Sequence, residues 1–442
     1  MKTSTRLGEL ETLIDRYADL PREAIVKEDL LRIGVDFSDE ALRLCEDAKP
    51  KSYFIFSFDR RPIDELERKE NLRAPEEIAL LGGPWEFRRT IVSVRILPGS
   101  PYRVEVGDGG LVLACEGTPL AQVELPATPS YYRRALRSGK PITEMAPTIE
   151  WGYLIYLTVY RKCQYFGFQE ECQFCDINEN YRQQRAAGRP YNTVKEVDEI
   201  VEALEIVHEE DREQKTKAFT ITGGSITKHL HGLGEADFYA RYARAIHERF
   251  PGRWISKVVV QALPKPELQA FRDAGVQIYH PNYEVWDPRL FSLLCPGKDR
   301  YVGRDEWIRR VLDAGDVFGP SRVIPNFVAG IEMSRPYGFE RVEDALSSTG
   351  EGLEFFMSRG ITPRFTTWCP EPLSTLGKDQ GPAPLAYHAG LLKLWRDTLL
   401  RHKLPAPPGY GDPGAGRAVF SVSAFLDALP AETPVAALGP AP

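Results

Sequence analysis

The sequence has no surplus of positive charge and no long apolar run. Its 442 residues include 56 lysines and arginines against 63 aspartates and glutamates, which gives a formal net charge of −7. General nucleic-acid binders neutralise phosphates with a basic surplus, so this balance argues against a nucleic-acid partner. No apolar run approaches the length of a membrane span, and the amino terminus lacks the apolar region of a secretory signal. We therefore expect a cytoplasmic protein without a membrane partner.

Cysteine is also scarce, and its distribution is uneven. Three of the seven cysteines lie within thirteen residues, at Cys163, Cys172 and Cys175. The other four are scattered singly: Cys45, Cys115, Cys295 and Cys369. An odd number without repeating spacing excludes the disulfide framework of small secreted proteins. We expect the four scattered cysteines to be buried in packing. A thiol on the substrate side is the alternative for Cys369, because that residue ends a predicted strand.

The sequence divides into three segments. Residues 1–150 predict an N-terminal α+β domain, with helices first and then a small antiparallel sheet over 85–125, whose short strands are joined by Asp-Gly and glycine turns. Residues 151–403 repeat a strand–helix unit six times, which predicts a parallel sheet in a partial (β/α)6 TIM-like barrel. Residues 404–442 are rich in proline, glycine and alanine and predict a poorly ordered tail.

The three clustered cysteines follow the first strand of this barrel. Residues 153–160 are rich in β-branched and aromatic side chains and predict a buried strand. The cysteines therefore lie on a loop at the carboxyl end of a strand, where α/β folds place their chemistry. Three thiolates can bind three irons of a [4Fe–4S] cluster and leave the fourth iron open. The alternative is a structural zinc, whose fourth ligand would have to come from afar, such as His208 or Cys295.

The pattern over residues 151–400 resembles the radical SAM superfamily. Phe174 lies between the last two cysteines, where that family places an aromatic ring against adenine. Gly223, Gly224 and Ser225 end the second strand and are similar to the family's Gly-Gly-Glu motif, with serine in place of the acid. The spacing C-x8-C-x2-C departs from the common C-x3-C-x2-C. The resemblance therefore indicates the superfamily and assigns no subfamily.

This resemblance implies two cofactors and a set of residues that contact them. The cofactors are a [4Fe–4S] cluster on the three cysteines and S-adenosyl-L-methionine (SAM) beside it. Besides Phe174 and the glycine turn, the implied SAM contacts lie on later strands: Gln261, Asn282, Glu284 and Gly330. His280 is a candidate acid or base for the substrate, and a buried histidine at a strand end is the alternative.

The implied activity is reductive cleavage of SAM and hydrogen abstraction from a small-molecule substrate in a biosynthetic pathway. A reductase, a flavodoxin or a ferredoxin would supply the electron. One alternative is a radical SAM enzyme that modifies RNA or transfers a methyl or methylthio group. The acidic balance argues against this RNA alternative. The other alternative is a zinc-stabilised α/β binding protein without catalytic activity, which metal content would distinguish.

Overall fold

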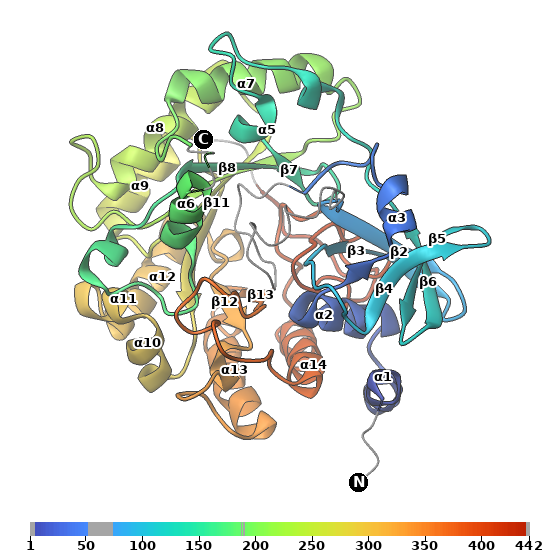
Figure 1. Ribbon diagram of the computed structural model, residues 1–442. Helices are drawn as coiled ribbons and strands as arrows, with labels where there is room; N and C mark the ends of the chain where they lie inside the picture. The colour runs from blue at the N-terminus through green and yellow to red at the C-terminus, as the bar shows by residue number, and fades with distance from the viewer. Residues whose placement is uncertain (1–4, 52–73, 187, 189–190, 439–442) are drawn as a thin grey trace.

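The computed structural model describes residues 5–51, 74–186, 188 and 191–438. Three helices, α1 (Arg6–Arg16), α2 (Arg22–Ile33) and α3 (Asp39–Leu44), accompany a six-stranded sheet (Figure 1). Its strands are β1 (Asp36–Phe37), β2 (Glu77–Gly82), β3 (Phe87–Ser93), β4 (Tyr102–Gly107), β5 (Gly110–Cys115) and β6 (Thr118–Glu124). The order is β1-β4-β5-β6-β2-β3, and every pairing is antiparallel except β1 with β4. The predicted N-terminal α+β unit is present.

The second sheet is the predicted partial barrel. Its strands are β7 (Thr148–Ile149), β8 (Leu154–Tyr160), β9 (Ala218–Gly223), β10 (Ile255–Val260), β11 (Ile278–Glu284), β12 (Asn326–Ala329) and β13 (Arg364–Thr367). They lie side by side in chain order, with β8 to β13 parallel and β7 antiparallel to β8. Strand β7 lies before residue 150 and already belongs to this sheet. The domain boundary proposed at residue 150 therefore stays a prediction.

Amphipathic helices cover the outer face of the barrel sheet (Figure 1). They are α7 (Val197–Glu210), α8 (Glu235–Arg249), α9 (Lys265–Asp273), α12 (Arg304–Phe318), α13 (Val342–Met357) and α14 (Leu385–Arg401). Shorter helices occupy the loops: α5 (Ile142–Met145), α6 (Ile177–Ala186), α10 (Pro288–Leu294) and α11 (Pro296–Tyr301). Among the described residues, no helix is long and apolar enough to cross a membrane.

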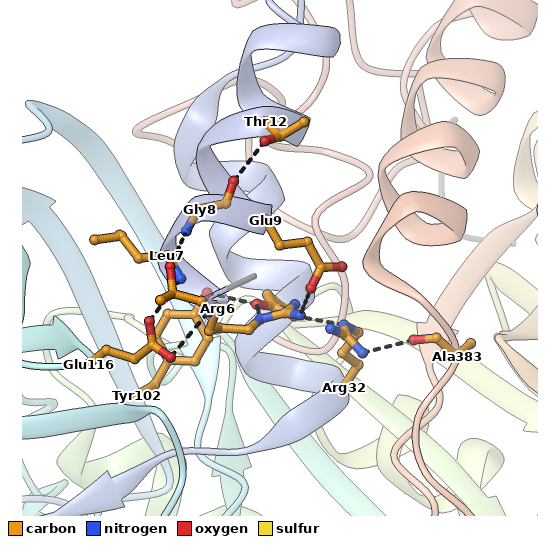
Figure 2. Close-up of polar contacts among 11 residues, drawn as sticks. Arg6, Leu7, Gly8, Glu9, Thr12, Arg32, Tyr102, Glu116 and Ala383 are labelled. Carbon is orange, nitrogen blue, oxygen red and sulfur yellow. Dashed lines mark hydrogen bonds and ion pairs between the residues drawn. The ribbon is translucent and has the colours of Figure 1, made fainter. Parts of the chain in front are cut away.

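Buried polar contacts tie the N-terminal helices to the barrel, and Figure 2 shows Arg6, Arg32 and Ala383 among them. Asp29 on α2 accepts hydrogen bonds from Arg6 Nε (2.7 Å), Arg32 Nε (2.6 Å) and Tyr102 Oη (2.7 Å). Arg32 also donates to the carbonyl of Ala383, just before α14 (2.9 Å). Because two guanidinium groups and a hydroxyl compensate the buried charge, this network holds α1, α2 and β4 in a fixed relation to the barrel.

The predicted disorder of the C-terminal tail is wrong for residues 404–438. This segment, drawn in red, lies between the two sheets (Figure 1) and hydrogen-bonds to both. Ser93 N at the end of β3 donates to Ser421 O (3.0 Å), and Thr367 N at the end of β13 donates to Val422 O (3.1 Å). The high content of proline, glycine and alanine suggested disorder, but a few large side chains in this segment are enough to pack it against both sheets.

The buried side chains of the C-terminal segment fill the concave face of the barrel. Tyr410, Phe420 and Phe425 are fully buried and contact one another edge to face. Asp427 forms a fully buried ion pair with Lys27 on α2 (2.8 Å). The segment therefore joins the N-terminal unit to the barrel interior.

Candidate functional site

The three clustered cysteines lie on one loop that leaves β8. A short 3-10 helix, η2 (Gln164–Phe168), takes up most of the eight-residue spacer, and Gln169 then reverses the chain in the left-handed region (φ 57°). Cys175 N donates to Cys172 O (2.9 Å), which closes a turn. Cys163, Cys172 and Cys175 line one cavity at the carboxyl ends of the parallel strands. The lengthened spacer is thus folded and keeps the three thiols together.

The end of β9 packs directly against this loop. A Cβ atom on Gly224 would lie 1.9 Å from Lys162 O and 2.6 Å from Cys163 Cα. A Cβ on Gly223 would lie 2.5 Å from Tyr160 O. Gly224 N donates to Tyr160 O (3.1 Å), and Gln164 N donates to Ser225 O (3.0 Å). The two glycines are therefore required by the approach of two backbones, in addition to the ligand approach expected from the sequence.

Burial shapes the acidity of the cysteine thiols. Removal from water raises the pKa of Cys163 to about 12 and the pKa of Cys175 well above its usual value. Without a metal these thiols are protonated at neutral pH, and metal binding would release their protons. The cavity therefore offers soft sulfur ligands whose charged form only a metal would stabilise.

Cys295 lies beside the cysteine loop although it is distant in sequence. It is fully buried at the end of α10, and burial together with a hydrogen bond to Cys172 raises the pKa of its thiol. His208, the other suggested zinc ligand, packs against Phe250, with 5.6 Å between ring centroids. Over the described ranges, no three His, Cys, Asp or Glu side chains are grouped closely enough to hold one metal ion.

Two predicted polar residues at the end of β11 face the same cavity. Asn282 Oδ1 is buried and has no hydrogen-bond partner among the described residues. Glu284 forms a buried ion pair with Lys298 of α11, whose Nζ also donates to Asn282 O (2.9 Å). Glu284 has a positive φ of 79°, and the register with β12 is irregular between these two residues. A buried acceptor without a donor and a strained backbone are typical of a ligand site.

The structure separates the other predicted contacts into two groups. Phe174 and Ser225 line the cavity with the cysteines. Gln261 does not, because its amide is hydrogen-bonded to Glu235 and to the hydroxyl of Tyr165. Gly330 also lies outside this lining. A Cβ atom added to it would lie 3.3 Å from Ala383 Cβ and 3.4 Å from His388 Nε2.

Several cavity residues were not expected from the sequence. The principal ones are Tyr156, Lys298, Asn326, Arg364, Thr366 and Trp368. Three of these alternate along and just beyond β13, and this period of two could have marked them as one inward face. Cys369 follows them in the cavity wall and is buried, so burial in packing and a thiol on the substrate side both stay predictions for it.

His280 lies beneath the cavity and is not part of its lining. Its Nδ1 is 3.1 Å from Ile324 O, and the ring packs edge to face on Tyr410. Burial and the nearby cations of Arg364 and Lys257 lower the pKa of His280 well below its usual value. The histidine is therefore neutral, which favours the structural role over acid–base work on a substrate.

Comparisons with known proteins give distant likenesses. No family model matches the chain. Bacteriochlorophyllide c C-7(1)-hydroxylase of Chlorobaculum limnaeum is 26% identical over 106 residues, which is 24% of this chain and 24% of that protein. Among solved structures, methylornithine synthase (PylB) has 13% identity and a TM-score of 0.41, over 55% of this chain and 61% of that one.

Two further structures are similar at the same level. HydG, a maturase of the [FeFe]-hydrogenase, has 14% identity and a TM-score of 0.38, over 55% of this chain and 48% of its own. The cobalamin-dependent S-adenosylmethionine radical enzyme OxsB has 12% identity and a TM-score of 0.33, over 66% and 35%. The chain thus spans less than two thirds of each of these proteins.

The structure brings together the residues that carry the sequence resemblance. Six parallel strands form a partial barrel, a loop with three cysteines follows the first of them, and a glycine turn ends the second. The loop and the turn pack against each other at the mouth of the barrel. These are the features on which the sequence resemblance to the radical SAM superfamily rests, and membership of that superfamily is part of the proposal that follows.

Proposed function

We propose that this protein is a radical SAM enzyme that abstracts a hydrogen atom from a small-molecule substrate in a biosynthetic pathway. The observation that carries the proposal is the meeting of three thiols and the glycine turn in one cavity at the carboxyl ends of parallel strands. A [4Fe–4S] cluster with one open iron, when bound, cleaves SAM reductively and supplies the abstracting radical. A flavodoxin, a ferredoxin or a reductase would deliver the electron.

The residues of the cavity fit these groups. Cys163, Cys172 and Cys175 would bind three irons, because thiolates are the usual protein ligands of such clusters. The backbone of Gly223 and Gly224, which has no Cβ to block approach, would hold the amino end of SAM. Asn282 Oδ1, a buried acceptor without a partner in the described chain, would accept a hydrogen bond from the cofactor or substrate.

A zinc site is a second candidate, because the fold brings a fourth thiol to the loop. Cys295 is buried beside Cys172, so a fourth thiol is within reach of the loop, and a set of four is what a structural zinc requires. In the described chain these thiols are not gathered around one point, so a zinc ion would have to draw them together. In that case Cys295 would be an essential ligand. In the radical enzyme it would be dispensable for metal binding, and this difference makes its variant informative.

The test is anaerobic reconstitution followed by metal, sulfide and product analysis. We expect about four irons and four sulfides per chain, and 5′-deoxyadenosine after addition of dithionite and SAM. Cys172→Ala should lose both, whereas Cys295→Ala should retain both. Cys115→Ala, a buried cysteine in β5, controls for the loss of any thiol. Stoichiometric zinc that disappears in both the Cys172 and the Cys295 variants would refute the radical proposal.

A further inference from the structure

Arg364 lies on the cavity wall opposite the cysteines. It begins β13, the strand at one end of the barrel sheet, whereas the cysteine loop follows β8 near the other end. Its side chain lines the cavity together with Thr366 and Trp368, which share its face of the strand. A cation at this place faces whatever molecule lies between the two walls.

Neutral groups hold the guanidinium in place. Arg364 Nε donates to Asn326 Oδ1 (3.0 Å), and Nη1 donates to the hydroxyl of Tyr410 (2.9 Å). Thr366 Oγ1 also donates to Asn326 Oδ1 (3.2 Å), which fixes the orientation of that amide. These bonds leave the Nη2 donors and one Nη1 hydrogen for a further acceptor.

No carboxylate of the described chain forms an ion pair with Arg364, although the other cation of the cavity lining has one. Lys298, for comparison, is paired with Glu284. A half-buried guanidinium without an anion is costly, because water no longer solvates it fully. An anionic ligand would remove that cost.

The other charged groups near Arg364 do not supply the missing anion. Lys257 on β10 adds a second buried cation, which lies 4.0 Å above the ring of Tyr410. Glu150, before β8, is fully buried, and burial raises its pKa to about 7 although Lys257 and Arg364 both attract its charge. It forms a close ion pair with neither cation, so Arg364 keeps open donors. Asp176 and Glu371 line the cavity on other segments, and each has contacts of its own.

We propose that Arg364 binds a carboxylate of the substrate, and this inference rests on the proposed function of the same cavity. A guanidinium with two adjacent open donors matches a planar carboxylate in geometry and charge. A phosphate monoester carries up to two negative charges, whereas the lining groups beside Arg364 are neutral: an amide, hydroxyls and an indole. The substrate class is therefore a carboxylic acid, held by its anionic end across the cavity from the cysteines.

The same chemistry could come from the carboxylate of SAM, and the experiment separates the two sources. Reconstituted protein with SAM is titrated with acetate, succinate and benzoate, each against its amide, at constant ionic strength. Binding is followed by calorimetry and by the midpoint of thermal unfolding. We expect at least one acid, and not its amide, to bind the wild type. Arg364→Gln should weaken the binding of that acid roughly tenfold to a hundredfold, because a charge-assisted hydrogen bond is lost.

Three controls decide the interpretation. Arg364→Lys should retain part of the affinity, Arg359→Gln on the protein surface should retain all of it, and SAM affinity should be unchanged in Arg364→Gln. Acids that bind no better than their amides, or that bind Arg364→Gln equally well, would overturn the proposal. A loss confined to SAM affinity would also overturn it, in favour of a SAM contact. Iron content and deoxyadenosine formation, measured separately on the wild type, show whether the proposed function itself fails.

Discussion

Replacement of Gly224 by alanine tests whether the glycine turn positions the cysteine loop. The new Cβ would lie 1.9 Å from Lys162 O, and ordinary contacts begin at 3.4 Å. Since the atoms that it meets are backbone atoms, no change of rotamer relieves the clash. The loop or the strand end must move by about 1.5 Å, and overpacking of this kind costs about 1–3 kcal/mol of stability.

A displacement of that size exceeds what a preorganised site tolerates. Ligands of a cofactor have to lie within about 0.5 Å of their productive positions. We therefore expect Gly224→Ala to bind less than about half of the wild-type iron after reconstitution. Its affinity for SAM, measured by equilibrium dialysis, and its thermal unfolding midpoint should both fall.

Gly167→Ala provides the matched control. Gly167 lies in the spacer of the same loop, its φ is not in the left-handed region, and an added Cβ would meet nothing within 4 Å. We expect this variant to keep wild-type iron content and SAM affinity. If Gly224→Ala also kept both, the argument that the turn holds the cysteine loop would be refuted.

Three further substitutions test individual buried charges. Lys298→Met should lower the free energy of unfolding, measured by urea titration, by about 3–5 kcal/mol, because it leaves the carboxylate of Glu284 buried and unpaired. The double variant with Glu284→Gln should recover part of that loss. Asp427→Asn should lower the free energy of unfolding by a similar amount, about 3–5 kcal/mol, because it removes the carboxylate that pairs with the buried ammonium of Lys27. An unchanged urea midpoint would contradict the packing of the C-terminal segment. Burial lowers the pKa of Lys195 to about 7, so above pH 7 the unfolded chain binds more protons at this group than the folded chain does. Stability should therefore rise between pH 7 and 9 by up to about 1.4 kcal/mol per pH unit, and Lys195→Met should lack this rise, whereas equal pH dependence in both proteins would exclude the assignment.

The sequence predicted those features that depend on local periodicity. Strands β8 to β13 and the helices between them carry strong alternating or amphipathic patterns, so the partial barrel followed from the pattern alone. The cysteine loop was predicted for the same reason, because a strand immediately precedes it. Features that depend on a distant contact were not predictable in this way.

Gln261 and Cys295 show the limit. Gln261 follows β10, where an inward side chain is expected, but Glu235 at the start of α8 binds its amide and keeps it from the cavity. Cys295 lies 120 positions beyond Cys175 in the sequence, and only the packing of α10 places its thiol beside Cys172. Composition also failed for residues 404–438, because average polarity does not reveal that three aromatic rings fill a concave surface.

The placement of residues 404–438 has a consequence for biogenesis. The ribosome synthesises all six parallel strands before this segment, so the concave face of the barrel lacks its filling while those strands first form. The contacts of Lys257 with Gly409 O and with the ring of Tyr410 can be made only afterwards. The cysteine loop, in contrast, takes its backbone contacts from β9, Leu294, Gly297 and Leu376, all of which are synthesised before residue 404. Metal delivery to the loop and closure of the barrel interior are therefore separable steps in the maturation of this protein.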